Sequence, residues 1–457
     1  MSRISVEETQ EYAVAPDVPM SAIERMKAIR EFHVGLARIR EAGGPVTMVR
    51  FWPDRLLPRF AVVTSPQGAH DVLAGADGAF DKEMLIHVEN RRLGENVFNL
   101  PHERWTGRRR TLQPIFTKRH VAEYSGHMAT AAESVAQGMV RHQVADLDEE
   151  MRLLTLQVFG RSAFGLDLGD EAHELGPHVR RMLQWMTNRA LRPVRSPIWL
   201  PTPARWRLRR SLAMVLGVVD RAIETARTDP EHEAELIRLL LEAREPDTGR
   251  PLSHEAIRDE LVIFLLAGHD TTSTTLTYAL WALGRDQAVQ DRVAAEVAAI
   301  GDRPLVVGDV PQMPYTVQVL HEALRVCPPA PAIGRLAMRD VAVDGHRIPA
   351  GTNVVVGIYA LHHDPRLWDS PSTFDPDRFS SERSVGRDRW QYLPFGAGPR
   401  SCIGDHFAML EATLGLATVV RAARIESLEP EFPLALPFTM TAAGPIPARV
   451  TARVGQS

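Results

Sequence analysis

The sequence has very few cysteines, two in 457 residues. This scarcity excludes a disulfide-stabilised scaffold and fits a reducing compartment. Basic residues are not in excess either, because the formal net charge is -4, which argues against a nucleic-acid-binding protein. No run approaches the ~18 apolar residues that span a bilayer, and residues 1–17 lack the apolar core of a signal peptide. We therefore expect a cytoplasmic protein with no membrane span and no nucleic-acid partner.

Helical spacing of apolar residues dominates the chain. The longest such pattern covers residues 253–283, and another begins at Gly404. Strand-like segments are short and few, and no internal repeat or clean linker divides the sequence. We predict a mainly α fold with a minor β region, in a single domain over residues 21–457. Residues 1–20 are expected to form a tail that need not be ordered.

Cys402 carries the strongest chemical signal in the chain. It follows a glycine-rich segment and precedes an apolar helix, whose first amide groups can donate toward a sulfur. Gly396 and Gly398 permit backbone conformations that other residues avoid, and Gly404 would let the helix approach a flat cofactor. The alternative is a buried, inert cysteine, which is how we interpret Cys327 at a helix end without glycines.

The segment around Cys402 resembles the haem-binding signature of the cytochrome P450 family. The resemblance implies haem b with Cys402 as the axial thiolate, lying between the helix over residues 253–283 and the helix that begins at Gly404. No glycine-rich dinucleotide loop is present, so we expect no bound flavin or nicotinamide. The matching positions are Phe395, Gly396, Gly398, Arg400, Cys402 and Gly404.

A second motif lies in the middle of the longest helical pattern. An acid next to an alcohol, Asp270-Thr271, is costly in an apolar helix unless both groups find partners. They could simply bond to the helix backbone. The stretch also resembles the oxygen-activating helix of the family, which implies that Thr271 contacts bound oxygen and Asp270 helps pass protons from water. Gly268 would leave room there, and His269 would have a supporting role.

Residues 322–325 read Glu-Ala-Leu-Arg, which places Glu322 and Arg325 on one helix face. Such a pair is often an ordinary surface ion pair. In the family the pair is buried and a later arginine completes it, so the resemblance implies a structural triad of Glu322, Arg325 and Arg378. The family often has Glu where Asp377 stands, which is a mild departure.

Trp105 and Arg109 lie at helical spacing and resemble the family pair that binds a haem propionate. Arg335 matches a further propionate arginine, and the planar fork of arginine suits carboxylates. Each arginine taken separately could instead be a solvated surface charge.

The resemblance implies a monooxygenase that inserts one atom of O2 into a lipophilic small molecule by hydroxylation or epoxidation. Electrons would come from separate proteins of the ferredoxin and ferredoxin reductase type. Alternatives are a haem-thiolate ligand sensor, an enzyme that uses peroxide directly, and, more remotely, a thiol-nucleophile enzyme. Because peroxide users need no proton relay, Asp270-Thr271 favours oxygen chemistry.

Arg108, Arg109, Arg110, Lys118 and Arg119 form a local basic run in a net acidic chain. The run could be a solvated helix face. We predict instead that an acidic electron donor docks near Arg108–Arg110.

The substrate pocket is expected to be mostly apolar, which favours a terpenoid, steroid, fatty acyl chain or polyketide, although core packing would explain the same residues. Residues 80–100 and 189–205 could form a lid. The candidate pocket residues are Phe264, Ala267, Ala332, Ile333, Phe438 and Met440.

Overall fold

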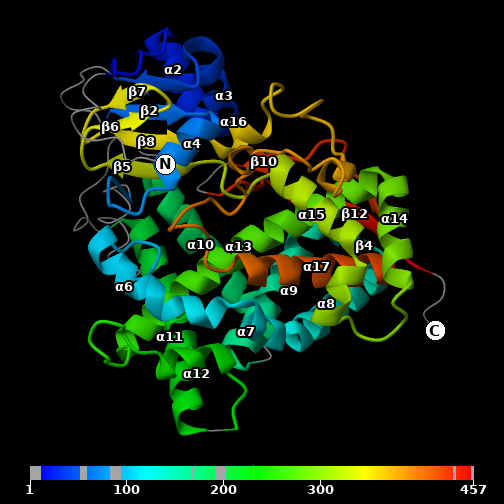
Figure 1. Cartoon of the computed structure of the whole chain (residues 1–457). Coiled ribbons are helices and arrows are strands. Elements are labelled where there is room, and N and C mark those ends of the chain that lie inside the picture. Colours follow the sequence, from blue (N-terminus) through cyan, green and yellow to red (C-terminus); the bar gives the residue numbers. More distant parts are fainter. Residues whose placement is uncertain are drawn as a thin grey trace.

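The chain forms a large helical part with a smaller part built on a five-stranded sheet at one side (Figure 1). The computed structural model describes residues 12–51, 59–82, 94–166, 169–190, 202–229, 231–435 and 439–453. The helical part contains α6 (His102–Leu112), α8 (Ser125–His142), α9 (Leu147–Phe159), α10 (Gly169–Ala190), α11 (Pro203–Thr228), α12 (Glu235–Glu242), α13 (His254–Arg285), α14 (Gln287–Ala298), α15 (Pro314–Val326) and α17 (Asp405–Ala422).

Helix α13 runs through the middle of the helical part and packs against α9 and α17 (Figure 1). Its first turn is capped by Ser253, whose hydroxyl accepts the amide N–H of Ala256 at 3.1 Å. Most residues of its middle and C-terminal portions are buried, but Ala267, Gly268 and Thr271 stay open on one face. This opening in an otherwise buried helix marks where a cavity lies. The long helix predicted over residues 253–283 is thus confirmed.

The five-stranded sheet has the order β1-β2-β8-β5-β3, formed by β1 (Val46–Val49), β2 (Phe60–Val63), β8 (Asn353–Val356), β5 (Ile333–Ala337) and β3 (Phe80–Asp81). β2 and β8 pair in parallel, and the other neighbours are antiparallel. The valine-rich strands suit a buried pleated surface. Around the sheet lie the short helices α2 (Ala22–Arg30), α3 (Phe32–Gly43), α4 (Pro66–Leu73) and α16 (Ile358–His362).

Part of the expected N-terminal tail is packed. The amide of Ala15 donates to the carbonyl of Arg347 at 3.2 Å, and the amide of Val18 donates to Met48 at 2.9 Å. Ala15 and Val18 are both buried. Residues 12–20 are thus held against the sheet by backbone hydrogen bonds and by two apolar side chains that reach the core.

Local breaks separate several of these elements. α2 ends and α3 begins at Glu31. The short strand β4 (Val144–Asp146) follows α8, because Gln143 ends that helix in the left-handed conformation with φ 59°. β4 joins a three-stranded sheet with β12 (Pro447–Ala452) and β9 (Ala423–Ser427), which brings the C-terminal segment beside α9.

The remaining elements are small. Two further antiparallel pairs are β6 (Val341–Val343) with β7 (His346–Ile348), and β10 (Leu434–Ala435) with β11 (Thr441–Ala442). The short helix α7 (Lys118–Glu123) precedes α8. Within the described ranges, every helix is too short or too polar to cross a bilayer.

Candidate active site

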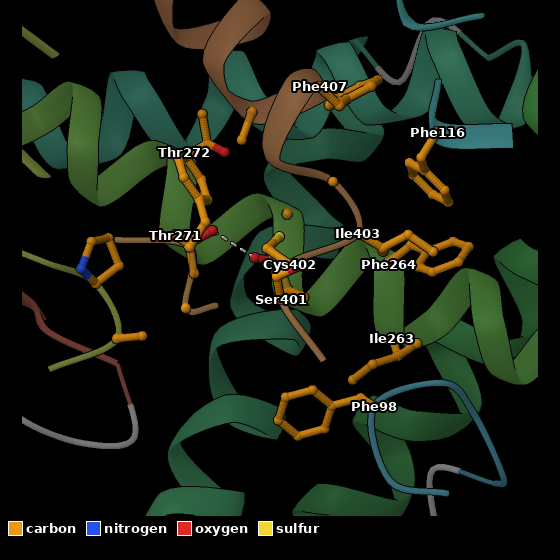
Figure 2. A pocket seen from close by; sticks show the side chains of 18 of the residues that line it. Phe98, Phe116, Ile263, Phe264, Thr271, Thr272, Ser401, Cys402, Ile403 and Phe407 are labelled. Carbon is orange, nitrogen blue, oxygen red and sulfur yellow. Dashed lines mark hydrogen bonds between the residues drawn. The ribbon is translucent and has the colours of Figure 1, made fainter. Parts of the chain in front are cut away.

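A cavity of about 390 Å3 lies between α13 and the segment that leads into α17. Figure 2 shows Ile263, Phe264 and Thr271 on α13 directed toward the same space as Cys402. The cavity thus brings together motifs that are far apart in the sequence. The predicted residues that line it are Trp105, Arg109, Phe264, Ala267, Thr271, Ile333, Arg335, Phe395, Arg400, Cys402 and Gly404.

A tight backbone loop presents Cys402 to the cavity. The amide of Cys402 donates to the carbonyl of Phe395 at 2.9 Å, which closes the loop. Gly396 and Gly398 have φ of 66° and 72°, and a Cβ at Gly398 would lie 1.8 Å from the carbonyl oxygen of Leu73. Only glycine fits at position 398, so the glycines predicted to matter do so for both conformation and space.

The Cys402 side chain is exposed to the cavity, and protein atoms surround the cavity on several sides. Burial raises its pKa to about 11, although the amide of Gly404 and the guanidinium of Arg109 work in the opposite direction. A free thiol here would be neutral, and a bound metal cation would hold it as the thiolate. Cys327 ends α15 inside the core, where burial raises its pKa to about 12, in keeping with the prediction that it is no ligand.

Four cationic side chains line the cavity: Lys82, Arg109, Arg335 and Arg400. Burial is the main cause that lowers the pKa of each, to about 10 for Arg335. The Arg400 guanidinium lies 4.4 Å from the ring centroid of Trp105. Cations gathered in an apolar cavity require an anionic partner.

Lys82 was not predicted as a site residue. Its ammonium nitrogen lies 3.9 Å from the ring centroid of Phe98, inside the cavity. The only sequence signal was a lysine next to an acid, Asp81, within a segment interpreted as loop. Its position beside Arg335 and Arg400 follows from the pairing of β3 with β5.

On α13, Thr271 and Asp270 have different surroundings. The hydroxyl of Thr271 donates to the carbonyl of Ala267 at 2.8 Å and faces the cavity. Asp270 is instead buried behind the helix, where Arg152 Nη1 donates to its Oδ1 at 2.7 Å and the Thr439 hydroxyl donates to its Oδ2. Asp270 does not line the cavity, whereas Thr439 does. Any proton that Asp270 supplies must therefore pass through a rearrangement or a neighbouring hydroxyl.

Two other polar groups near this motif are buried. His269 Nδ1 lies 2.9 Å from the Thr155 hydroxyl, and burial lowers the His269 pKa to about 3, so its ring is neutral. Glu411 on α17 was missed by sequence reasoning because it lies in an apolar helix without a partner at helical spacing. Burial raises its pKa well above the ordinary value, and the nearby Thr272 hydroxyl offsets only part of that effect.

The predicted triad is present and buried. Arg325 donates to both oxygens of Glu322 at 2.7 Å, and Arg378 Nε lies 3.3 Å from Glu322 Oε1. The remaining donors of Arg325 bind the carbonyls of His362, Pro371 and Thr373. The departure from the family pattern at Asp377 has an explanation, because its carboxylate forms a two-bond ion pair with Arg292, away from the triad.

Several candidate pocket and docking residues are not where the sequence predicted them. Ala332 packs with the cluster around α3 and β2, and Met440 is buried in the main core, so neither lines the cavity. Phe438 lies outside the described residues. Of the expected lid segments, 83–93 and 191–201 also lie outside them, while Val97 and Phe98 line the cavity.

Arg108 is not a free docking residue. Its Nη1 donates to Oε1 of Glu260, a carboxylate that is fully buried on α13, at 2.8 Å. The prediction that Arg108 meets a partner protein is therefore wrong, because a buried acid 152 positions away in the sequence already binds it. Arg110 remains exposed.

Comparison with known proteins identifies the family. A family model described as Cytochrome P450 matches residues 22–448. The chain is a cytochrome P450. It is 30% identical over 386 residues to cyclooctat-9-en-7-ol 5-monooxygenase of Streptomyces melanosporofaciens, covering 84% of this chain and 83% of that one. It is 30% identical over 395 residues to pentalenene oxygenase of Streptomyces avermitilis, covering 85% and 86%.

A solved structure shares the fold. The haem domain of a cytochrome P450DA mutant superposes with a TM-score of 0.85 at 25% identity, covering 96% of this chain and 98% of that one. The mainly α P450 fold predicted from the sequence is confirmed, and so is the assignment as a P450 monooxygenase.

The residues of this P450 fit a haem thiolate. Cys402 would supply the sulfur, and the cationic end of the cavity suits the carboxylates of the cofactor. Arg109 Nε is buried without a hydrogen-bond partner, as expected of a donor that awaits a ligand. A Cβ at Gly268 or Gly404 would meet nothing within 4 Å, so both backbones border open space on opposite walls.

Proposed function

We propose that this P450 inserts one atom of O2 into a neutral, hydrocarbon-rich small molecule of terpenoid type, by hydroxylation or epoxidation. The observation that carries the proposal is the distribution of charge in the cavity. Among the described lining residues, the charged side chains are the four cations at the cofactor end. The two haem carboxylates and Asp81 would pair with cations at this end of the cavity, and the rest of the described lining carries no charge to recognise a charged substrate.

The wall above the cofactor supports a bulky, rigid substrate. Phe116 and Phe264 meet edge to face with ring centroids 5.0 Å apart, and Phe98 and Ile263 extend the same apolar wall (Figure 2). Apolar walls with few polar groups are typical of sites for lipophilic ligands. The names of two relatives, an oxygenase of pentalenene and a monooxygenase of an unsaturated alcohol, point to the same chemical class.

The haem supplies the oxygen chemistry when it is bound. The protein supplies the groups that hold protons and the cavity walls that position the substrate. Thr271 places a hydroxyl at the cavity wall, where it can hold a proton close to the reacting atoms. Asp270 would supply protons from behind α13 once its bond to Arg152 or Thr439 loosens. Proton supply by Asp270 therefore depends on Arg152 and Thr439, two partners that the spacing of residues in the sequence does not reveal.

We also propose haem b as the cofactor and a separate acidic redox protein as the electron donor. The chain has two cysteines, and one of them is the axial ligand, which excludes attachment through a pair of thioethers. Arg110, Lys118 and Arg119 are exposed on neighbouring segments and form the revised docking surface. A cytoplasmic location stays a prediction.

The proposal is tested in two steps with the purified protein. First, the reduced protein under carbon monoxide should show the red-shifted Soret band of thiolate ligation, and Cys402→Ser should abolish it. Second, the oxidised protein is titrated with polycyclic alkenes. In a separate comparison it is titrated with a fatty acid and with the fatty alcohol of the same chain length. Alkenes should shift the spin state, and the acid should bind no more tightly than the alcohol. Preferential binding of the acid would contradict a neutral substrate.

Turnover separates the alternatives. With ferredoxin, its reductase and a nicotinamide donor, oxygen uptake should require the substrate found by titration. Product formation with peroxide alone would favour direct peroxide use. Ligand binding with no uptake under either condition would favour a sensor.

A further inference from the structure

Asp81 lies at the junction of three segments that hold cavity residues. It ends β3, which pairs with β5, the strand that carries Arg335. Its side chain is only 11% exposed. A carboxylate in such a place is costly unless its charge and hydrogen bonds are satisfied.

The carboxylate of Asp81 is fully engaged. Its Oδ1 accepts from Arg400 Nη2 at 2.8 Å and from the amide of Lys82 at 2.7 Å. Its Oδ2 accepts the amide of His102 at 3.0 Å. One carboxylate thus joins the loop before Cys402, the end of β3 and the start of α6.

The contact with His102 provides a cap that α6 lacks locally. The residue before α6 is Pro101, whose side chain cannot accept a hydrogen bond. The first amides of a helix have no partner within it, and a negative charge near them is favourable. Asp81 therefore fixes the start of the helix that carries Trp105 and Arg109.

The contact with Arg400 fixes the orientation of a guanidinium. Arg400 donates to Asp81 on one side and to the carbonyl of Leu100 at 3.2 Å on another, and its plane lies over Trp105. A guanidinium has five N–H donors. Two such anchors leave donors of Arg400 directed at the cavity, where the haem carboxylates belong.

We propose that Asp81 is the positioning residue for the haem carboxylate site, acting through Arg400 and α6, and that its charge lowers the reduction potential of the haem iron. The first part rests on the contacts above. The second part rests on charge. Lys82, Arg335 and Arg400 are three cations at one end of the cavity, and the negative charge of Asp81 acts on all three of them.

The sign of the potential shift follows from electrostatics. Reduction adds one negative charge to the haem centre, and a nearby anion in a low-dielectric interior opposes that change. Removal of the Asp81 charge should therefore make the potential more positive. The inference depends on the haem and not on the proposed substrate, so its failure would leave the proposed function untouched.

The test compares Asp81→Asn and Asp81→Glu with the control Asp77→Asn. Asp77 lies four residues earlier and pairs with the half-exposed Arg339, outside the cavity. Each holoprotein is examined by spectroelectrochemical titration and by the rate of haem transfer to apomyoglobin. Asp81→Asn should raise the potential and speed haem loss several-fold. Asp81→Glu should keep the potential near that of the wild type, and the control should change neither quantity.

A merely structural role for Asp81 predicts a different result. In that case Asp81→Asn would lower the unfolding midpoint, and the potential would stay at the wild-type value in the folded holoprotein. An unchanged potential would overturn the electrostatic part of the proposal. An unchanged rate of haem transfer would overturn the positioning part.

Discussion

Glu260 offers a quantitative test of the buried charges around the site. Its carboxylate accepts from Arg108 and, through both oxygens, from the amide of Val97 at 2.9 and 3.1 Å. Beside it, Asp259 accepts the amide of Glu95 at 3.0 Å. The pair of acids thus anchors residues 94–100, which contribute to the cavity wall.

Burial raises the pKa of Glu260 from 4.5 to about 7, and Arg108 and the Val97 amide only partly offset that effect. Between these two pH values the folded protein holds a proton that the unfolded chain has lost. The free energy of unfolding therefore falls as pH rises through this window. At about 1.4 kcal/mol for each pH unit, ionisation of Glu260 costs on the order of 3 kcal/mol by pH 8.

Glu260→Gln should remove this dependence, because the amide mimics the protonated acid. We expect the unfolding free energy of the variant, relative to wild type, to increase by about 2.5 kcal/mol between pH 5 and pH 8. Urea unfolding of the holoprotein, followed by circular dichroism and Soret absorbance, measures the difference. The exposed Glu224→Gln on α11 is the control and should give a pH-independent difference. A flat or decreasing difference for Glu260→Gln would refute the reasoning.

Three further predictions concern the triad, the cavity alcohol and the docking surface. Arg325→Lys leaves buried oxygens of Glu322 and of carbonyl groups unpaired, so it should lower the unfolding free energy by on the order of 3 kcal/mol in urea. Thr271→Val should keep the substrate-induced spin-state shift but lower the product formed per nicotinamide oxidised; equal yields would reject a proton-holding hydroxyl. Arg110→Glu should slow reduction by ferredoxin at low salt and less at high salt, where screening weakens steering, whereas Arg30→Glu on α2 should not. Equal rates for both variants would reject docking there.

The part of the site that could be predicted lies within single helices and loops. Trp105 with Arg109, and Glu322 with Arg325, are set by helical spacing, which a sequence displays directly. The loop before Cys402 is readable because a positive φ, as at Gly396 and Gly398, strongly favours glycine. In these places the structure requires a helical spacing or a glycine conformation that a short stretch of sequence already displays.

The part that could not be predicted depends on partners distant in sequence. Arg152 lies 118 positions before Asp270, and Asp81 lies 319 positions before Arg400. No local pattern reveals either pairing. Packing of α9 against α13 brings Arg152 to Asp270, and the tertiary fold places Asp81, at the end of β3, beside Arg400 in the loop before Cys402. Arg108 was misassigned for the same reason.

The distribution of buried charge links these observations. Cations face into the cavity, whereas the nearby acids Asp81, Asp270 and Glu260 lie behind its lining and each binds an arginine. A buried acid in the wall itself would repel the cofactor carboxylates, and a cation without an acid behind it would be poorly oriented. The acids therefore lie close to the cavity without entering it. Substitutions behind the wall should alter potential, proton supply and stability more than they alter the fit of a neutral substrate.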